Sequence, residues 1–182
     1  MGATTSQGTG PGSAVLDLPP IVNGVVKSAN VGVNAISESG LNVTPVPVTA
    51  ATLTVTEADH AGKVIVLNRA AGITATLPRA VGSGASFKFF VLTTVTSNTT
   101  VIKVDNATDV MQGLALAAAD GGNSVNGWET AASSDTITLD GSTTGGLRGD
   151  VITLVDVYPG VFAVTALLAQ TGTEATPFSA TV

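Results

Sequence analysis

Cysteine is absent from this 182-residue sequence, and charged and aromatic side chains are scarce, at 11% and 4% of the residues. Without cysteine the chain has no disulfide bonds and no thiolate for catalysis or metal binding. An average globular domain carries about 25% charged residues, so a monomer of this composition would expose an unusually neutral surface. Proteins bury such surface in permanent contacts, and the low charge therefore favours a protein that works inside an assembly.

Basic patches and long apolar runs are also missing. The net charge is −6 and the seven Lys and Arg residues are scattered, which argues against nucleic acid as a direct partner. No apolar run reaches the roughly 18 residues of a transmembrane helix, which argues against a membrane partner. Residues 1–12 lack the basic start and apolar centre of a signal peptide. We therefore expect synthesis in a cytoplasm without a secretory signal.

The residues that are abundant favour β-structure. Hydrophobic residues make up 44% of the chain and are mostly Val, Ala, Leu and Ile, so most of the chain should fold. Val and Thr are β-branched and suit pleated, half-buried surfaces, and the 21 glycines suit tight turns. The length allows one ordinary domain and an arm.

The pattern of apolar and turn-forming residues changes near residue 48. Residues 1–14 are Gly, Thr, Ser and Pro without periodic hydrophobicity, which predicts a mobile tail. Residues 15–48 are apolar but broken by prolines and glycines, so no useful helix fits there. This stretch could form short strands or an extended arm that lies on a neighbour. We therefore predict an N-terminal tail and arm over residues 1–48 and a β domain over residues 49–182.

Regular turn signals in the second part predict strands of four to ten residues. This spacing is typical of an antiparallel β-sandwich or a small barrel, and we predict that all-β class. Residues 111–119 have helix-forming composition, weakened by Gly113, and residues 121–126 are expected to form a surface loop. The clearest strands are expected at residues 52–56, 63–68, 73–77, 86–95, 99–104, 136–139, 151–158 and 161–168.

The strand at residues 86–95 is the most aromatic part of the chain. Alternation places Phe87, Phe89 and Val91 on one face, with Lys88, Phe90 and Leu92 on the other. Because the chain has only five Phe, we expect the first face to lie in the core.

Residues able to carry catalysis are few. His60 is the only histidine, and we interpret it as a solvated turn residue, since a metal site or a catalytic triad needs convergent partners. A cluster of aspartates could in principle serve a glycosidase or bind calcium, but strand-end and turn roles explain it. The cluster comprises Asp135, Asp140, Asp150 and Asp156. We therefore expect no catalytic, cofactor-binding or metal-binding residues and no enzymatic activity.

Short glycine-containing motifs in the sequence do not indicate a functional site. Gly82-Ser83-Gly84 and Gly145-Gly146 lack the following helix of a phosphate-binding loop and are expected to form turns. Arg148-Gly149-Asp150 matches a tripeptide of cell-adhesion ligands, but it leads directly into a predicted strand, and we interpret it structurally.

Several segments, read in order, resemble a known class of proteins. They are residues 53–68 (LTVTEADHAGKVIVLN), 72–78 (GITATLP), 82–91 (GSGASFKFFV), 149–156 (GDVITLVD) and 176–179 (TPFS). This order is similar to the head decoration, cement and head-fibre proteins of tailed bacteriophages. The resemblance covers roughly residues 51–182, and its motifs are turns and strands rather than chemical motifs.

The resemblance implies a β-rich protein, commonly a homotrimer, that binds the major capsid protein on the outside of an icosahedral shell where capsomers meet. We therefore expect a structural virion protein on the capsid exterior, made in the host cytoplasm. One alternative is a receptor-binding module of a head or tail fibre, for which Trp128 and Tyr158 are the candidate exposed aromatics. A β-fold carbohydrate-active enzyme is a further alternative.

Overall fold

The computed structural model describes residues 21–22, 25–26, 44–120 and 124–182. The chain divides into two compact units, Met1–Asn42 and Val43–Val182. In the first unit, β1 (Ile21–Val22) and β2 (Val25–Val26) pair antiparallel. The predicted tail and most of the predicted arm lie outside the described residues. The second unit holds the strands of the β domain.

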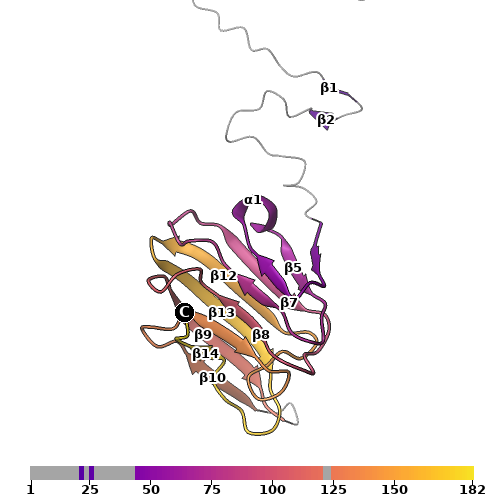
Figure 1. Cartoon of the computed structure of the whole chain (residues 1–182), viewed down its shortest axis with the longest axis vertical. Helices are drawn as coiled ribbons and strands as arrows, with labels where there is room; N and C mark the ends of the chain where they lie inside the picture. The colour runs from indigo at the N-terminus through magenta and orange to yellow at the C-terminus, as the bar shows by residue number, and fades with distance from the viewer. Residues whose placement is uncertain (1–20, 23–24, 27–43, 121–123) are drawn as a thin grey trace, which may run out of the picture. The chain divides into compact units, whose positions relative to one another are not determined.

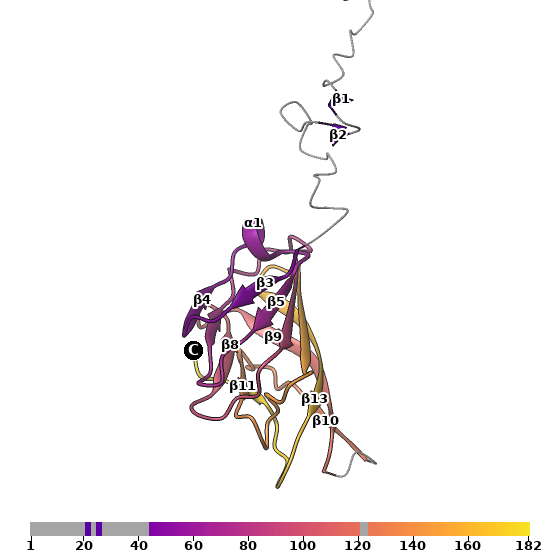
Figure 2. The same cartoon turned by 90° about the vertical axis from the view of Figure 1, so that its right-hand side faces the viewer.

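The β domain is a sandwich of two sheets (Figure 1), which Figure 2 shows edge-on as two layers. The larger sheet has the order β10-β9-β13-β12-β7-β5-β3, and the smaller has the order β14-β11-β8-β6-β4. The strands are β3 (Val46–Val48), β4 (Thr52–Thr54), β5 (Val64–Leu67), β6 (Thr74–Thr76), β7 (Ser86–Val91), β8 (Thr100–Lys103), β9 (Val110–Ala118), β10 (Val125–Glu129), β11 (Thr136–Leu139), β12 (Val151–Tyr158), β13 (Val161–Ala169) and β14 (Phe178–Ser179). A single short helix within the described residues, α1 (Glu57–His60), follows β4.

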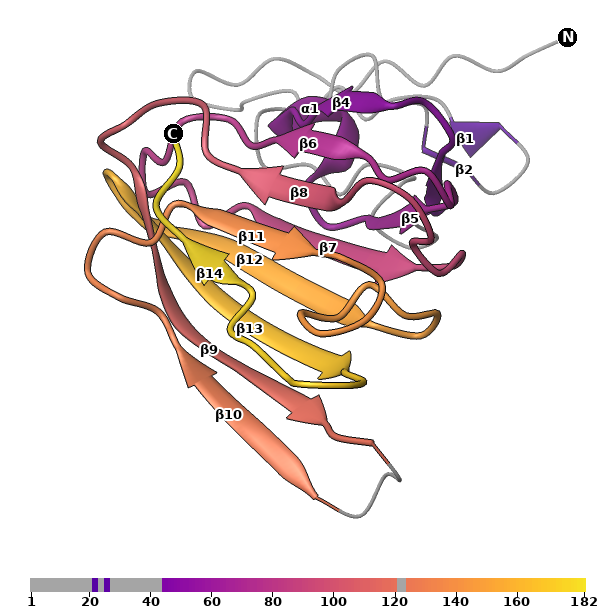
Figure 3. The ribbon, with the colours of Figure 1, turned by 60° about the horizontal axis from the view of Figure 1, so that its bottom comes forward.

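The prediction of an all-β sandwich is confirmed, but the sheets are mixed where we expected antiparallel pairing. From β3 to β8 the chain changes sheet at every connection, so it winds as a coil and each strand returns to its sheet in the same direction. As a result β3, β5 and β7 pair in parallel, as do β4, β6 and β8. Hairpins then give antiparallel pairs, β9 with β10 and β12 with β13 (Figure 3).

The core lies between the sheets and contains the predicted aromatic face. Phe87 and Phe89 are fully buried and Val91 is nearly so, while Lys88 and Leu92 are exposed and Phe90 is half-buried. Alternate residues of the other long strands, including Ile152, Leu154 and Phe162, fill the same space. The prediction for this strand is therefore confirmed.

The β domain begins before the predicted boundary at residue 48. Residues Val46–Val48 form β3, which pairs in parallel with β5 at the edge of the larger sheet, and Val48 is buried. Pro47 is tolerated there because an edge strand can leave one side without hydrogen-bond donors. The irregular segment thus contributes its last residues to the fold.

The segment of helix-forming composition is a strand. Residues 110–118 form β9, whose inward side chains Met111, Ala115 and Ala117 are fully buried and which pairs along its length with β13. Tertiary pairing overrides the weak helix propensity. Gly113 has φ +152°, and a Cβ there would lie 1.9 Å from the Val164 carbonyl oxygen, so this position requires glycine.

Part of the predicted loop at residues 121–126 is also strand. Residues 121–123 lie outside the described residues, and Val125–Glu129 form β10, the edge strand that pairs antiparallel with β9. The edge strand β14 was likewise not predicted, because its two residues are too short to give a pattern.

Candidate functional site

Asp156, on β12, holds the loop that precedes β7. Its carboxylate accepts hydrogen bonds from the backbone N–H groups of Val81 (3.0 Å), Gly82 (2.7 Å) and Ser83 (3.0 Å), and from the Ser83 hydroxyl (2.9 Å). Burial acts to raise the pKa of Asp156, but these hydrogen bonds outweigh it and hold the pKa below its ordinary value. The amides of the predicted glycine turn thus enclose an anion, and that anion is the protein's own carboxylate.

Asp150 is buried as well, with 3% of its surface exposed. It accepts hydrogen bonds from the backbone N–H groups of Gly146 (2.7 Å), Leu147 (3.1 Å) and Ala169 (2.9 Å). Burial raises the pKa of its carboxyl group above the ordinary value, although these hydrogen bonds act in the opposite direction. Because the Asp150 carboxylate is enclosed, the Arg148-Gly149-Asp150 tripeptide does not present the acid that an adhesion ligand would need.

The other two aspartates of the cluster also bind backbone amides nearby. Asp135 accepts from the N–H groups of Thr181 and Val182 and so fixes the C-terminal residues. Asp140 accepts from the backbone N–H groups of Ser142 and Thr144 and from the Thr143 hydroxyl in the loop after β11. Burial acts to raise the pKa of Asp140, but these hydrogen bonds outweigh it and hold the pKa below its ordinary value. Among the described residues, no group of three or more His, Asp or Glu side chains could hold a metal ion.

His60 is buried, with 7% of its surface exposed, so its interpretation as a solvated turn residue is wrong. It ends α1, and its Nδ1 accepts a hydrogen bond from the backbone N–H of Thr56 at 3.1 Å. The same nitrogen lies 3.2 Å from the Thr56 carbonyl oxygen and 3.4 Å from the Thr56 hydroxyl. The Thr56 hydroxyl caps the same helix by accepting from the Asp59 N–H, so His60 stabilises a turn together with the capping residue.

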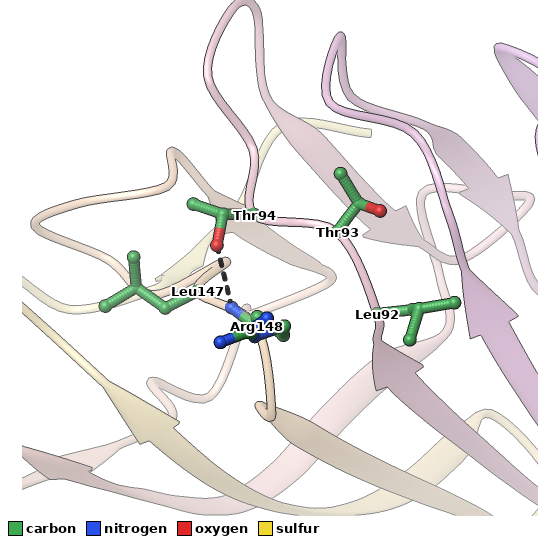
Figure 4. Close-up of a pocket in the computed structure, with 5 residues that line it drawn as sticks. All are labelled: Leu92, Thr93, Thr94, Leu147 and Arg148. Atoms are coloured by element: carbon green, nitrogen blue, oxygen red, sulfur yellow. Dashed lines mark hydrogen bonds between the residues drawn. The ribbon is translucent and has the colours of Figure 1, made fainter.

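One cleft of about 450 Å³ lies between the end of β7 and the loop before β12. Figure 4 shows the residues that line it, which are Leu92, Thr93, Thr94, Leu147 and Arg148. The backbone N–H of Arg148 donates a hydrogen bond to the Thr94 hydroxyl at 3.0 Å. The lining contains one cationic side chain, Arg148, and two threonine hydroxyls. It contains no carboxylate or histidine that could activate these hydroxyls. This set supports no general acid–base chemistry.

The two candidate aromatics for ligand recognition differ in exposure. Trp128 is half-buried against the core, and its indole N–H donates to the Gln170 side chain at 3.1 Å. Tyr158, at the end of β12, is 68% exposed. Of the two, Tyr158 is therefore the one available to a ligand.

The outer faces of the two sheets differ sharply in chemistry. On the smaller sheet, outward residues are mainly threonines, with Thr52 beside Thr74 and Thr54 beside Thr76 in register. On the larger sheet they are mainly aliphatic, and no described segment of the β domain itself lies over this face (Figure 2). One row in register across its seven strands consists of Gly127, Leu116, Leu167, Val151, Phe90, Val66 and Pro47.

Four residues near one edge of the larger sheet form an exposed apolar group that we call the leucine cluster. It lies on β10, β9 and β13 and comprises Leu114, Leu116, Val125 and Leu167. Leu167 is 58% exposed and its register partner Leu116 is 43% exposed. The sequence carried a signal for this cluster, because Leu114–Ala117 is apolar at successive positions, and a strand that is apolar on both faces is suited to burial on both.

No protein-family model, curated protein or solved structure matches the chain. Among the described residues, no helix has the length and apolar character needed to cross a membrane.

Proposed function

We propose that this protein is a structural virion protein of a tailed bacteriophage. It binds the major capsid protein on the outer surface of the assembled shell, at capsomer junctions, and stabilises the shell as a homotrimer. The observation that carries the proposal is a charge-poor β domain whose larger sheet leaves an aliphatic face exposed, which suits a subunit of a permanent assembly. The aspartates support a static role, because their carboxylates are committed to backbone hydrogen bonds.

The physical basis of such stabilisation is linkage. A protein that binds only the mature shell lowers the free energy of that state by mass action, by about 2.7 kcal/mol per site at 100 times the dissociation constant. Three linked copies raise the effective concentration of the second and third contacts, so weak individual contacts add to a stable clamp. This role needs no catalytic residue.

Binding to purified shells tests the proposal. Mature shells lacking the protein and unexpanded shells of the same phage are each mixed with the full-length chain, sedimented and imaged by electron microscopy. We expect saturable binding to mature shells, visible as nodules, and a higher temperature of shell disruption. Unexpanded shells are the matched control and should bind at least about tenfold more weakly. Absence of binding to both forms would refute the proposal.

A receptor-binding fibre module is the second candidate, and the exposure of Tyr158 favours it. Exposed aromatic rings are common anchors for sugars and protein ligands. Imaging of the source particle separates the two roles, since a fibre module would appear on a fibre and not on the shell. The carbohydrate-active enzyme has less support, because its candidate acids Asp135, Asp140, Asp150 and Asp156 each bind backbone amides.

A further inference from the structure

We infer that the outer face of the larger sheet is the contact surface between copies of this chain. The inference deepens the proposed function, because it assigns a surface to the proposed homotrimer. It starts from the contrast between the threonine face of the smaller sheet and the aliphatic face of the larger one. Threonine hydroxyls are well solvated in water, whereas a contiguous aliphatic face is stabilised by burial.

The size of this face suits a protein interface. Seven strands about 4.8 Å apart span about 29 Å, and the outward positions from Gln112 to Ala118 span about 20 Å along β9. The resulting flat area is about 600 Å², and protruding side chains add to it. This approaches the roughly 800 Å² that each partner buries in a standard interface.

The charges on this face indicate that the partner is a second copy. In the paired positions of the sheet, the outward charged residues are Lys88 on β7 and Glu129 on β10. They belong to one row, in register through Leu114, Thr165 and Thr153. Four strand spacings separate Lys88 from Glu129, about 19 Å, so they do not pair within one chain.

Rotational symmetry would bring these charges together. When copies turn this face toward a common axis, the β7 side of one copy meets the β10 side of the next. Lys88 then lies opposite Glu129 of the neighbouring copy, while the leucine cluster meets the aliphatic part of the row that contains Val66 and Phe90. The face is therefore complementary to itself in both charge and hydrophobicity.

Lysine substitutions in the face provide the first test. Leu116→Lys and Leu167→Lys change exposed side chains, so the core between the sheets stays filled. Val101→Lys is the matched control, because Val101 lies on the outer face of the smaller sheet between Thr74 and Thr138. Sedimentation of the full-length wild type at micromolar concentration should give three times the chain mass of 17.9 kDa. Each face variant should raise the dissociation constant at least about tenfold, because it brings an unpaired charge into the contact, and the control should change it less than about twofold.

A charge swap provides the second test, and it probes the pairing itself. Lys88→Glu and Glu129→Lys should each weaken association by about 3- to 10-fold, since each places like charges opposite one another. The double variant should restore the wild-type dissociation constant within about twofold. Because the two residues are far apart in one chain, such rescue requires contact between copies.

The outcomes separate this inference from the proposed function. A wild-type monomer at 50 μM, or face variants that associate like the control, would overturn the inference. If the wild type is a monomer and the face variants lose shell binding instead, the capsid covers this face and the inference is wrong while the function stands. If the wild type is a dimer that dissociates in the same face variants, the assignment of this face as the contact surface is supported and the trimer is wrong. An assembly that depends on the face but ignores shells would support the inference and overturn the function.

Discussion

Replacing Asp156 by asparagine should destabilise the β domain and do so in a pH-dependent way. One carboxylate oxygen accepts from the Val81 N–H, the Ser83 N–H and the Ser83 hydroxyl, and the other accepts from the Gly82 N–H. An asparagine oxygen can replace the first, but its NH₂ group then opposes the Gly82 N–H, so one hydrogen bond is lost. The remaining bonds lose the charge on the acceptor.

The size of the effect follows from these bonds. Losing one hydrogen bond to a charged acceptor costs about 1.5–3 kcal/mol, and neutralising the acceptor weakens the other three by about 0.5 kcal/mol each. The loop itself is exposed, so its freed N–H groups can turn to water, which reduces the total. We expect a loss of about 2–4 kcal/mol in the free energy of unfolding at pH 7, a large part of the 5–15 kcal/mol typical of a domain.

The pH dependence gives the effect a second, independent readout. Because the folded protein holds the pKa of Asp156 below its ordinary value, the carboxylate stabilises the fold above the unfolded-state pKa of about 3.9. This stabilisation is lost as the pH falls through the lower, folded-state pKa. The difference between wild type and Asp156→Asn should therefore be full at pH 7 and should shrink below about pH 4.

Urea unfolding followed by circular dichroism at several pH values measures both effects. Asp105→Asn is the matched control, because the exposed Asp105 carboxylate accepts from the neighbouring Asn106 side chain, and it should change stability by less than about 0.5 kcal/mol at pH 7. A loss below about 1 kcal/mol for Asp156→Asn, or a loss that is the same at pH 3 and pH 7, would refute the assigned role.

Three further changes test the packing of the β domain. Phe87→Ala should cost about 3–5 kcal/mol in urea unfolding, whereas Phe90→Ala on the half-buried outer face should cost clearly less; equal costs would contradict the assignment of faces. Gly113→Ala should cost more than about 2 kcal/mol, because its Cβ would meet the Val164 carbonyl oxygen, and Gly127→Ala is the control, since its nearest neighbour would be a flexible Leu116 methyl group at 3.9 Å. Removing residues 1–42 should change the melting temperature of the β domain by less than about 3 °C, and it should weaken shell binding if the arm attaches the protein. Removing residues 1–48 should lower the melting temperature further, because β3 is lost from the sheet. A truncation at residue 42 that unfolds the domain would show that the first unit supplies part of its core.

Local patterns in the sequence determined the β class, most strand positions and the aromatic core. Alternation is a property of a single strand, so Phe87 and Phe89 could be assigned to the core, and residues 151–158 to a strand, without knowledge of any partner strand. The turn assignment of Asp140 and Asp150 also followed from local signals, and their hydrogen bonds to nearby backbone amides agree with it. Asp156 differs, because it lies within β12 and binds the backbone of a loop 73 to 75 residues away in the sequence.

Only the tertiary structure decided which strands become neighbours. The parallel pairs of β3, β5 and β7 depend on the chain changing sheet at each turn, which no local pattern encodes. The strand at β9 arises because pairing with β13 outweighs a weak helix propensity. The apolar outer face exists for the same reason. Leu116, Leu167, Val151 and Phe90 come from distant parts of the sequence, and strand order alone places them side by side.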